Sequence, residues 1–256
     1  MKMLDYAKIE HLKLIMFAGE PMPNKQLNYW RNHIKKAKYA NLFGPTETTD
    51  ICTFYVVNRK FRDDESLPIG VSCNNCSTFI VDDNNKQITK AGQVGELYAR
   101  GPFLASGYFK NPEKTQAVFV QNPLHNNYPE TVYKTGDLVK LNEFGEYEYV
   151  GRKDFQIKHL GYRVELGEIE TATYGVEKVQ NAVCVYDTET DDIVLLYVGR
   201  IKESELLEQL KTKVPYYMIP TMFLKVPELP YNMNGKIDRA FLKNNYKSYI
   251  KTNEEK

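Results

Sequence analysis

The chain has 256 residues, with 34 Lys and Arg against 33 Asp and Glu, so that its formal net charge is +1. Hydrophobic residues make up 42% of it and charged residues 26%, which excludes a disordered, a collagen-like or a small disulfide-stapled chain. The nearly balanced charge gives no support to nucleic acid or an acidic membrane surface as a partner.

An α/β layer is predicted for residues 1–67. Leu12–Ala18 is apolar enough for a buried strand, and Tyr39–Phe43 has the pattern of a second short strand. Between them a helix is indicated by apolar residues at helical spacing, namely Leu27, Trp30 and Ile34. Strand, helix and strand in this order are typical of a parallel sheet. Ligands of such sheets bind at the carboxyl ends of the strands, where residues 44–49 fall.

A β-rich unit is predicted for residues 68–153, because short alternating runs are separated by Asn, Asp and Gly turn signals. The expected antiparallel strands are Ser77–Val81, Val94–Arg100, Tyr133–Leu141 and Glu146–Val150. One helix fits within this unit, around Pro112–Phe119.

A small α+β unit is predicted for residues 154–256, a plausible size for a separate domain. We expect its boundary at Arg152–Asp154. Its expected elements are a strand at Phe155–Lys158, a helix from Glu165, strands at Ala182–Tyr186 and Ile193–Val198, a helix at Glu203–Lys213 and a proline-punctuated tail.

No segment has the pattern of a signal peptide or a membrane span, since the apolar run Leu12–Gly19 is too short. Cys73 and Cys76 have the spacing of a metal or redox pair, but no second CxxC or His pair accompanies them. Free thiols in a reducing cytoplasm are therefore favoured over a zinc or redox site.

The turn Phe43–Thr49 (FGPTETT) carries an aromatic ring, several hydroxyls and a carboxylate. A site for a phosphoanhydride and a divalent cation needs a ring to stack on a base, hydroxyl donors for phosphate and an acidic oxygen for Mg²⁺. A polar turn with a side-chain cap explains the same composition equally well.

Three other polar segments each allow two interpretations. Asp137 follows a glycine at the end of a strand, where its carboxylate could accept both hydroxyls of a ribose, although a turn aspartate is simpler. Lys236 on an Asn-Gly turn could neutralise charge developing on a carboxylate and a phosphate, although a solvated lysine is simpler. Gly151–Asp154 fits a surface ion pair or a hinge.

Together these segments resemble, in order and spacing, the signature motifs of the adenylate-forming superfamily. The resemblance is greatest to the amino-acid adenylation domains of nonribosomal peptide synthetases and to D-alanine–carrier protein ligases. It covers nearly the whole chain through Phe43–Glu47 (FGPTE), Gly95–Tyr108 (GELYARGPFLASGY), Tyr133–Leu138 (YKTGDL), Gly151–Glu170 (GRKDFQIKHLGYRVELGEIE), Tyr217–Pro220 (YMIP) and Asn234–Arg239 (NGKIDR).

The resemblance implies an enzyme that uses ATP and Mg²⁺ to activate a carboxylate, here an amino acid, as an acyl-adenylate with release of pyrophosphate. Such enzymes then pass the acyl group to a thiol, here the phosphopantetheine of an acyl or peptidyl carrier protein.

The same resemblance assigns roles to particular residues. Its catalytic assignments are Lys236 as the lysine bridging carboxylate and phosphate, Thr46 on the α-phosphate and Glu47 on Mg²⁺. Its nucleotide-binding assignments are Asn41, Phe43, Gly44, Asp137, Tyr149 and Arg152, with Phe43 stacking on adenine and Asp137 holding the ribose. Asp154 is implied as the hinge of a rotating small domain, and Ala18 with Gly19 as part of the acyl pocket.

The chain also departs from the family pattern, since Phe43 replaces a more common tyrosine and no Ser/Thr/Gly-rich phosphate loop is found. Family members are much longer, and their N-terminal half carries that loop and most of the acyl pocket. We therefore expect the C-terminal part of a large adenylation domain followed by a small lid domain, inactive without the other half. An exposed sheet edge and apolar face would accompany such a division.

Two alternatives remain open. One is an acyl-CoA or aryl-acid ligase of the same superfamily. The other is a non-catalytic module that binds AMP or a carrier protein.

Overall fold

The computed structural model describes residues 3–6 and 8–254, without the side chains of Met3, Asp154, Arg163 and residues 251–254. The chain forms two compact units. Unit 1 comprises Met1–Met22, Gln26–Phe61 and Ser66–Asp154, and unit 2 comprises Pro23–Lys25, Arg62–Glu65 and Phe155–Lys256.

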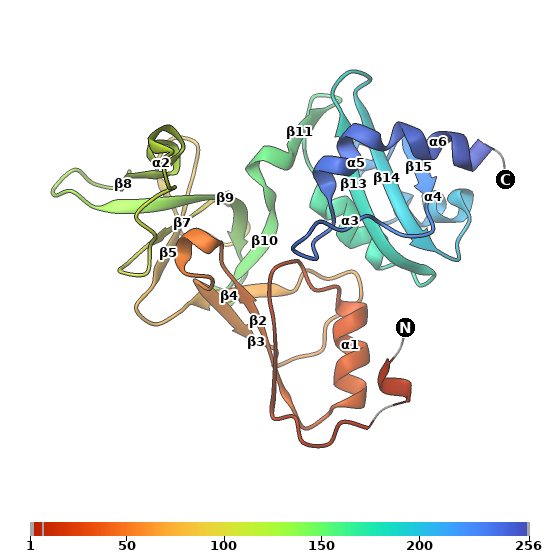
Figure 1. The fold of residues 1–256 in the computed structure, drawn as a ribbon, viewed down its shortest axis with the longest axis horizontal. Coiled ribbons are helices and arrows are strands. Elements are labelled where there is room, and N and C mark those ends of the chain that lie inside the picture. Colours follow the sequence, from red (N-terminus) through yellow and green to blue (C-terminus); the bar gives the residue numbers. More distant parts are fainter. Residues whose placement is uncertain (1–2, 7, 255–256) are drawn as a thin grey trace. The chain divides into compact units, whose positions relative to one another are not determined.

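Unit 1 begins, after a short 3₁₀ turn at Met3–Asp5, with the predicted strand–helix–strand order. Strand β1 (Leu14–Phe17) lies parallel to β2 (Lys38–Phe43), and helix α1 (Asn24–His33) connects them (Figure 1). Strands β3 (Thr53–Val56) and β4 (Pro68–Ser72) then extend the sheet in antiparallel fashion. The predicted parallel pair is thus confirmed, within a sheet that continues antiparallel.

The predicted burial of the first strand is wrong. Strand β1 is an edge strand that pairs with β2, and its residues alternate between two environments. Ile15 and Phe17 pack into the core beneath α1, whereas Leu14 is 48% and Met16 60% exposed. Because one helix covers one face only, every second side chain of this strand is left outside.

The β-rich part of unit 1 is antiparallel, as predicted, in the strand order β4-β10-β9-β7-β5-β6 with β8 paired to β9. Its elements are β5 (Ser77–Val81), β6 (Gln87–Ile88), β7 (Val94–Arg100), α2 (Pro112–Val118), β8 (Phe119–Gln121), β9 (Thr131–Leu141) and β10 (Tyr147–Arg152). Helix α2 begins as its sequence dictates, with Asn111 accepting a hydrogen bond from the Lys114 backbone N–H and Pro112 in the first turn.

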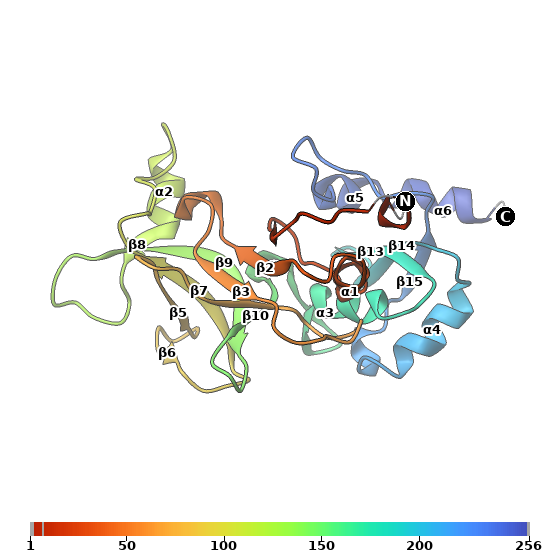
Figure 2. The same cartoon turned by 90° about the horizontal axis from the view of Figure 1, so that it is seen from below.

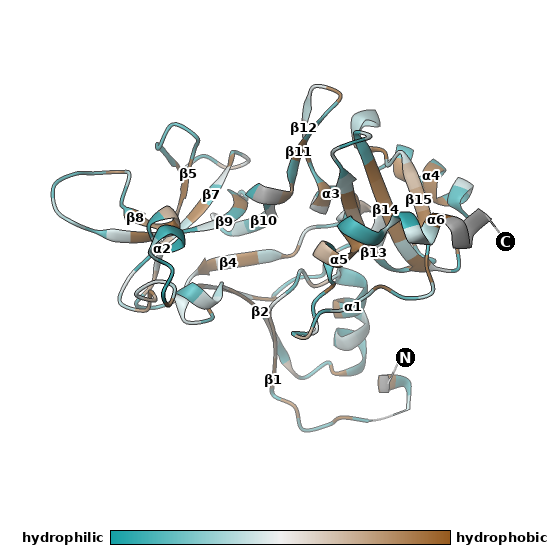
Figure 3. Ribbon diagram, turned by 45° about the horizontal axis from the view of Figure 1, so that its top comes forward, coloured by the Kyte–Doolittle hydropathy of each residue, from teal (hydrophilic) through white to brown (hydrophobic). Residues whose placement is uncertain are grey.

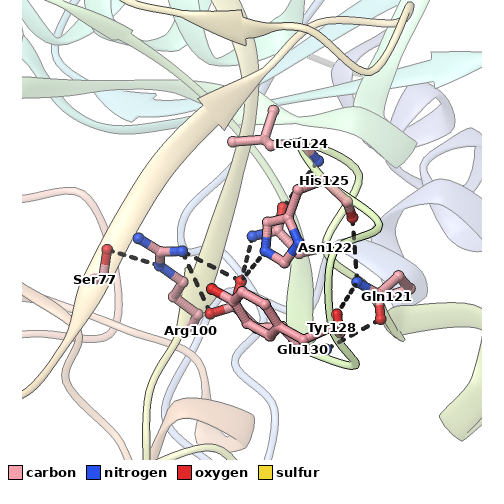
Figure 4. A network of polar contacts seen from close by, with 8 residues as sticks. All are labelled: Ser77, Arg100, Gln121, Asn122, Leu124, His125, Tyr128 and Glu130. Atoms are coloured by element: carbon pink, nitrogen blue, oxygen red, sulfur yellow. Dashed lines mark hydrogen bonds and ion pairs between the residues drawn. The ribbon is translucent and has the colours of Figure 1, made fainter.

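The connection between β8 and β9 is held together by one carboxylate, that of Glu130 (Figure 4). It accepts hydrogen bonds from Asn122 Nδ2 at 2.5 Å and His125 Nε2 at 2.9 Å, and Arg100 Nη1 lies 3.2 Å away. The hydrogen bond from Asn122, followed by that from His125, lowers the pKa of Glu130 to about 2.

Unit 2 is built on a three-stranded sheet, β13-β14-β15, with an antiparallel and a parallel pair. It also contains the hairpin β11–β12. Its elements are β11 (Gln156–His159), β12 (Tyr162–Glu165), α3 (Leu166–Tyr174), β13 (Val179–Asp187), β14 (Asp192–Gly199), α4 (Glu203–Lys211), β15 (Met222–Lys225), α5 (Arg239–Asn245) and α6 (Lys247–Glu254).

Helices cover both faces of this sheet, and its central strands are strongly hydrophobic (Figures 2 and 3). One core joins inward residues of β13 and β14 to α3 and α4, with Ile169, Leu195 and Leu206 fully buried. The opposite core joins the alternate strand residues to α5 and α6, through Leu242 and Tyr246. The proline-punctuated tail expected after Lys213 supplies a strand and two helices to this unit. No helix in the described ranges is long and apolar enough to cross a membrane.

Candidate functional site

The turn after β2 is shaped by close backbone packing. Cys52 donates its backbone N–H to the Phe43 carbonyl at 2.9 Å, so that the chain folds back directly over Gly44. A Cβ on Gly44 would collide with the backbone of residues 50–52, which explains a glycine at this position. In the 3₁₀ turn that follows (Thr46–Thr48), the buried Thr48 hydroxyl donates to the Pro45 carbonyl at 2.8 Å, while Thr46 is exposed.

The Glu47 carboxylate accepts a hydrogen bond from the hydroxyl of Tyr108. Its backbone is fixed as well, because Ala105 donates its N–H to the Glu47 carbonyl at 2.8 Å. Burial, followed by the hydrogen bond to Glu47, raises the pKa of Tyr108. Burial and the hydrogen bond with Tyr108 also raise the pKa of Tyr133 far above its usual value. Both hydroxyls therefore stay protonated at neutral pH, and Tyr108 is a hydrogen-bond donor to Glu47.

Asp137 lies in a bulge of β9 and faces the last residue of β10. The Arg152 Nη1 atom lies 3.5 Å from Asp137 Oδ1 and donates to the Thr135 carbonyl at 2.8 Å. Gly136 has φ +71° beneath the same guanidinium, where an added Cβ would come within 3.0 Å of Arg152 Nη2. The positive backbone angle favours a glycine here, and any larger residue would also have to displace the guanidinium slightly.

Two aromatic rings meet between β2 and β10. The centroids of Phe43 and Tyr149 are 5.9 Å apart, with an interplanar angle of 46°. Tyr149 precedes Arg152 on the same strand, β10. Asn41, on β2, is buried, and its amide donates to the Pro68 carbonyl at 2.8 Å, which ties β2 to the start of β4.

Unit 1 therefore assembles predicted residues that are widely separated in the chain. The turn after β2 and strands β9 and β10 hold them in three contacts, Phe43 with Tyr149, Asp137 with Arg152, and Glu47 with Tyr108, and the charge of Arg152 also acts on Tyr108. Such a set can stack on a planar base, accept from hydroxyl groups and bind a phosphate or its cation.

Other predicted residues lie elsewhere. Ala18 and Gly19 are exposed just after β1, where Gly19 has φ +98°. The side chain of Asp154 lies outside the described residues.

Lys236 belongs to unit 2, on a turn closed by the bridge between Tyr231 and Ile237. Asn232 organises this turn, because its side-chain oxygen accepts the backbone N–H groups of Asn234 at 2.9 Å and Lys236 at 3.1 Å. The Lys236 side chain is exposed at this turn.

Sequence reasoning missed the two tyrosines beside Glu47. Tyr108 and Tyr133 stand at the end and the beginning of motifs that the sequence does display, GELYARGPFLASGY and YKTGDL. The motifs were therefore a signal for these residues, whereas the hydrogen bond to Glu47 joins positions 61 residues apart.

The residues present suit only one mode of Mg²⁺ binding. In the described part of the chain, no group of three or more His, Cys, Asp or Glu side chains is arranged to hold a metal. Mg²⁺ is commonly held by one or two carboxylates together with the phosphates of a substrate and water. Glu47, a single carboxylate beside an exposed hydroxyl-bearing turn, suits that mode.

The cysteines are free thiols. Burial raises the pKa of Cys52 to about 12, and burial followed by the proximity of Cys73 raises that of Cys76 to about 11. Thiols that stay protonated at neutral pH are poor nucleophiles and poor metal ligands.

Residues 2–109 match the family described as AMP-binding enzyme. Over 251 residues the chain is 36% identical to tyrocidine synthase 3 of Brevibacillus parabrevis. The matched stretch covers 94% of this chain and 4% of tyrocidine synthase 3. The solved structure of Klebsiella oxytoca NpsA in complex with 3-hydroxyanthranilyl-AMSN superposes with a TM-score of 0.82 and 24% identity, over 91% of this chain and 48% of that one. Holo-AB3403, a four-domain nonribosomal peptide synthetase bound to AMP and glycine, superposes with a TM-score of 0.76 and 26% identity, over 93% of this chain and 20% of that one.

The chain thus spans about half the length of NpsA and a small share of the peptide synthetases that it matches. The likeness to NpsA confirms the predicted fold class, a mixed α/β fold with one large sheet and further helices that forms part of an adenylation-type structure.

Proposed function

Because this chain belongs to the AMP-binding enzyme family, we propose that it forms part of a ligase that activates an amino acid as an aminoacyl-adenylate with ATP. The aminoacyl group then passes to the phosphopantetheine thiol of a carrier protein. The observation that carries the proposal is a set of three contacts within unit 1, those of Phe43 with Tyr149, Asp137 with Arg152 and Glu47 with Tyr108. We place the reaction in the cytoplasm, where the free cysteines stay reduced.

The nucleotide is held at the junction of β2, β9 and β10. Phe43 and Tyr149 present their rings to adenine, with Asn41 and the backbone of Gly44 beside it. The Asp137 carboxylate accepts the two ribose hydroxyls, and the nearby Arg152 orients it and compensates its charge.

The phosphate end of the nucleotide meets the turn after β2. The exposed Thr46 hydroxyl donates to the α-phosphate, and Glu47 holds Mg²⁺, oriented by the hydroxyl of Tyr108. Mg²⁺ supplies charge neutralisation of the phosphates when it is bound.

The remaining roles belong to residues outside that cluster. Lys236 places its ammonium group between the substrate carboxylate and the α-phosphate, where negative charge develops in the transition state. The exposed turn leaves this side chain accessible to a substrate. Asp154 is the hinge about which the small domain rotates between the two half-reactions. Ala18 and Gly19 border the acyl group.

The second candidate function is a ligase for an aryl acid or another carboxylate. NpsA, whose solved structure contains 3-hydroxyanthranilyl-AMSN, supports it by fold alone. We rank the amino-acid ligase first because the identity to tyrocidine synthase 3 is 36% over nearly the whole chain. The third candidate is a module that binds AMP or a carrier protein without catalysis.

Calorimetry of the chain with AMP and Mg²⁺ tests the nucleotide site. We expect saturable binding that is lost in Asp137→Ala and unchanged in Glu143→Ala, a matched control because Glu143 is an exposed acid of the β9–β10 turn. Equal binding by Asp137→Ala and the unaltered chain would contradict the ribose role.

The catalytic role needs the complete protein. There, Lys236→Ala should abolish amino-acid-dependent ATP–pyrophosphate exchange while AMP binding persists. Retained exchange in Lys236→Ala would remove this lysine from the mechanism. Exchange that depends on an aryl acid instead of an amino acid would select the second candidate.

A further inference from the structure

The strand that carries Asp137 is interrupted directly before it. In the pairing of β7 with β9, Glu96 faces Leu138 and Tyr98 faces Lys134, so that residues 135–137 of β9 lie opposite Leu97 alone. A bulge of this kind takes backbone N–H groups out of the ladder and re-aims the side chains beside it.

The freed backbone groups of this bulge are satisfied by side chains. The Asp137 N–H donates to Thr135 Oγ1 at 3.0 Å, and that hydroxyl in turn donates to the Leu97 carbonyl at 2.8 Å. The Gly136 N–H donates to Glu96 Oε1 at 3.2 Å. Glu96, from the neighbouring strand β7, thus supplies an acceptor that the sheet itself does not provide.

A carboxylate is an energetically unfavourable acceptor at this position, because Glu96 is only 5% exposed. A buried charge destabilises a fold unless it is paired. Lys153 supplies the pair, since its Nζ atom lies 3.3 Å from Glu96 Oε2 and 3.3 Å from the exposed Asp83. A neutral glutamine would make the same bond to Gly136 without needing a counter-ion.

We propose that Glu96 is a positioning residue for the Asp137 carboxylate, acting through the Gly136 N–H, with Lys153 as its counter-ion. The inference rests on the proposed role of Asp137 in nucleotide binding. It connects Asp137, through Glu96 and Lys153, to the proposed hinge residue, because Lys153 directly precedes Asp154. Whatever displaces Lys153 leaves Glu96 uncompensated and loosens the bulge that aims Asp137.

The test compares three substitutions in the whole chain. Glu96→Leu removes the acceptor, Glu96→Gln keeps an acceptor of the same shape without the charge, and Lys153→Met removes the counter-ion. Glu148→Leu is the matched control, because Glu148 is a half-buried β10 glutamate that pairs with Lys140 at 3.6 Å. The readouts are hydrogen exchange of the Gly136 and Asp137 amides by NMR and AMP affinity by calorimetry.

We expect Glu96→Leu to accelerate exchange at Gly136 and to weaken AMP binding by about tenfold or more, as for a buried donor left without a partner. Glu96→Gln should restore both properties, and Glu148→Leu should change neither. Lys153→Met should weaken AMP binding, and the Glu96→Gln/Lys153→Met double variant should recover it, because no charge then remains to compensate.

The outcomes separate this inference from the proposed function. If the unaltered chain binds no AMP but Glu96→Leu still accelerates Gly136 exchange, the nucleotide role fails and the support of the bulge by Glu96 stands. If exchange at Gly136 is the same in Glu96→Leu, Glu96→Gln and the unaltered chain, the inference is overturned whether or not AMP binds. Should Glu96→Gln be as impaired as Glu96→Leu, the acceptor role is overturned as well.

Discussion

The β13–β15 sheet of unit 2 and the β1–β4 part of the unit 1 sheet are both made of short apolar strands, but they are covered differently. In unit 2, α3 and α4 pack on one face and α5 and α6 on the other (Figure 2). In unit 1, α1 packs on one face, and the register places exposed apolar side chains on the other, namely Leu14, Met16, Phe54, Val56 and Val71. This confirms the apolar face and strand edge expected from the sequence.

The difference separates two functions of apolar residues. Those of unit 2 stabilise the unit that contains them, whereas those on the open face of unit 1 contribute little to folding of this chain. They remain available for association, since contiguous exposed apolar patches mark interaction surfaces or aggregation sites.

The sharpest test of this contrast compares a core leucine with a surface methionine. Leu195→Ala, at a fully buried position of β14, should lower the free energy of unfolding of unit 2 by about 3 kcal/mol or more. Met16→Ala should change the stability of unit 1 by less than about 0.5 kcal/mol. The single tryptophan, Trp30, packs in the core of unit 1, so its fluorescence follows that unit in urea titrations while circular dichroism follows both.

An equally large loss in Met16→Ala would show that the open face is covered in solution. A shift of the Trp30 transition in Leu195→Ala as large as that seen by circular dichroism would show that the two units unfold together.

A second contrast concerns ion pairs in unit 2. Arg239 contacts Glu170 through two hydrogen bonds of 2.6 Å, and Glu170, which is buried, also accepts the Cys184 N–H at 2.7 Å. Arg239→Lys loses the bidentate geometry and should cost about 1–3 kcal/mol by urea denaturation. In the exposed pair of Lys178 with Glu205, Lys178→Met should change the free energy of unfolding much less, because solvent screens the pair. Similar losses in both variants would contradict the importance of burial.

The Glu130 cluster of unit 1 predicts a pH effect. Its carboxyl is held at a pKa of about 2 by Asn122 and then His125, against 4.5 for the free group (Figure 4). A lowered pKa gives stabilisation that is complete above the unfolded value and is lost as pH falls toward the folded value. The unfolding midpoint of the unaltered chain should therefore exceed that of Glu130→Gln near neutral pH, and the gap should shrink by about pH 3.

Thermal scans of Trp30 fluorescence at both pH values measure this gap, with Glu143→Gln as the control that should show none. A gap that stays constant down to pH 3 would mean that Glu130 titrates normally in the folded chain.

The smallest effect on stability is expected on the open face itself. Met16→Lys and Val56→Lys place a charge where the side chain already meets water, so the unfolding midpoint should hardly move. Self-association in sedimentation velocity should decrease, because the charge interrupts an apolar surface beside the β1 edge. Unchanged self-association would show that another part of the chain mediates it.

The amino-acid sequence was sufficient to predict the local features of this protein and the family that it resembles. Alternating and helical spacings placed most strands and helices of both units, because burial on one face imposes a period on the chain. The motifs also predicted three tight backbone positions, namely Gly44, Gly136 and the Asn-Gly turn before Lys236. The order of the motifs identified the family and the polar residues that unit 1 gathers.

The contacts between distant residues, in contrast, depend on the three-dimensional arrangement of the elements. The exposure of β1 depends on its edge position, and the tail after Lys213 is ordered because β15 pairs with β14. The partner of Glu47 lies in the segment between β7 and α2, and that of Glu96 lies in the bulge of the neighbouring strand β9. Those two carboxylates bond to residues 61 and 40 positions away in the chain. Local propensity acts over a few residues, whereas such contacts exist only once a particular strand order has been formed.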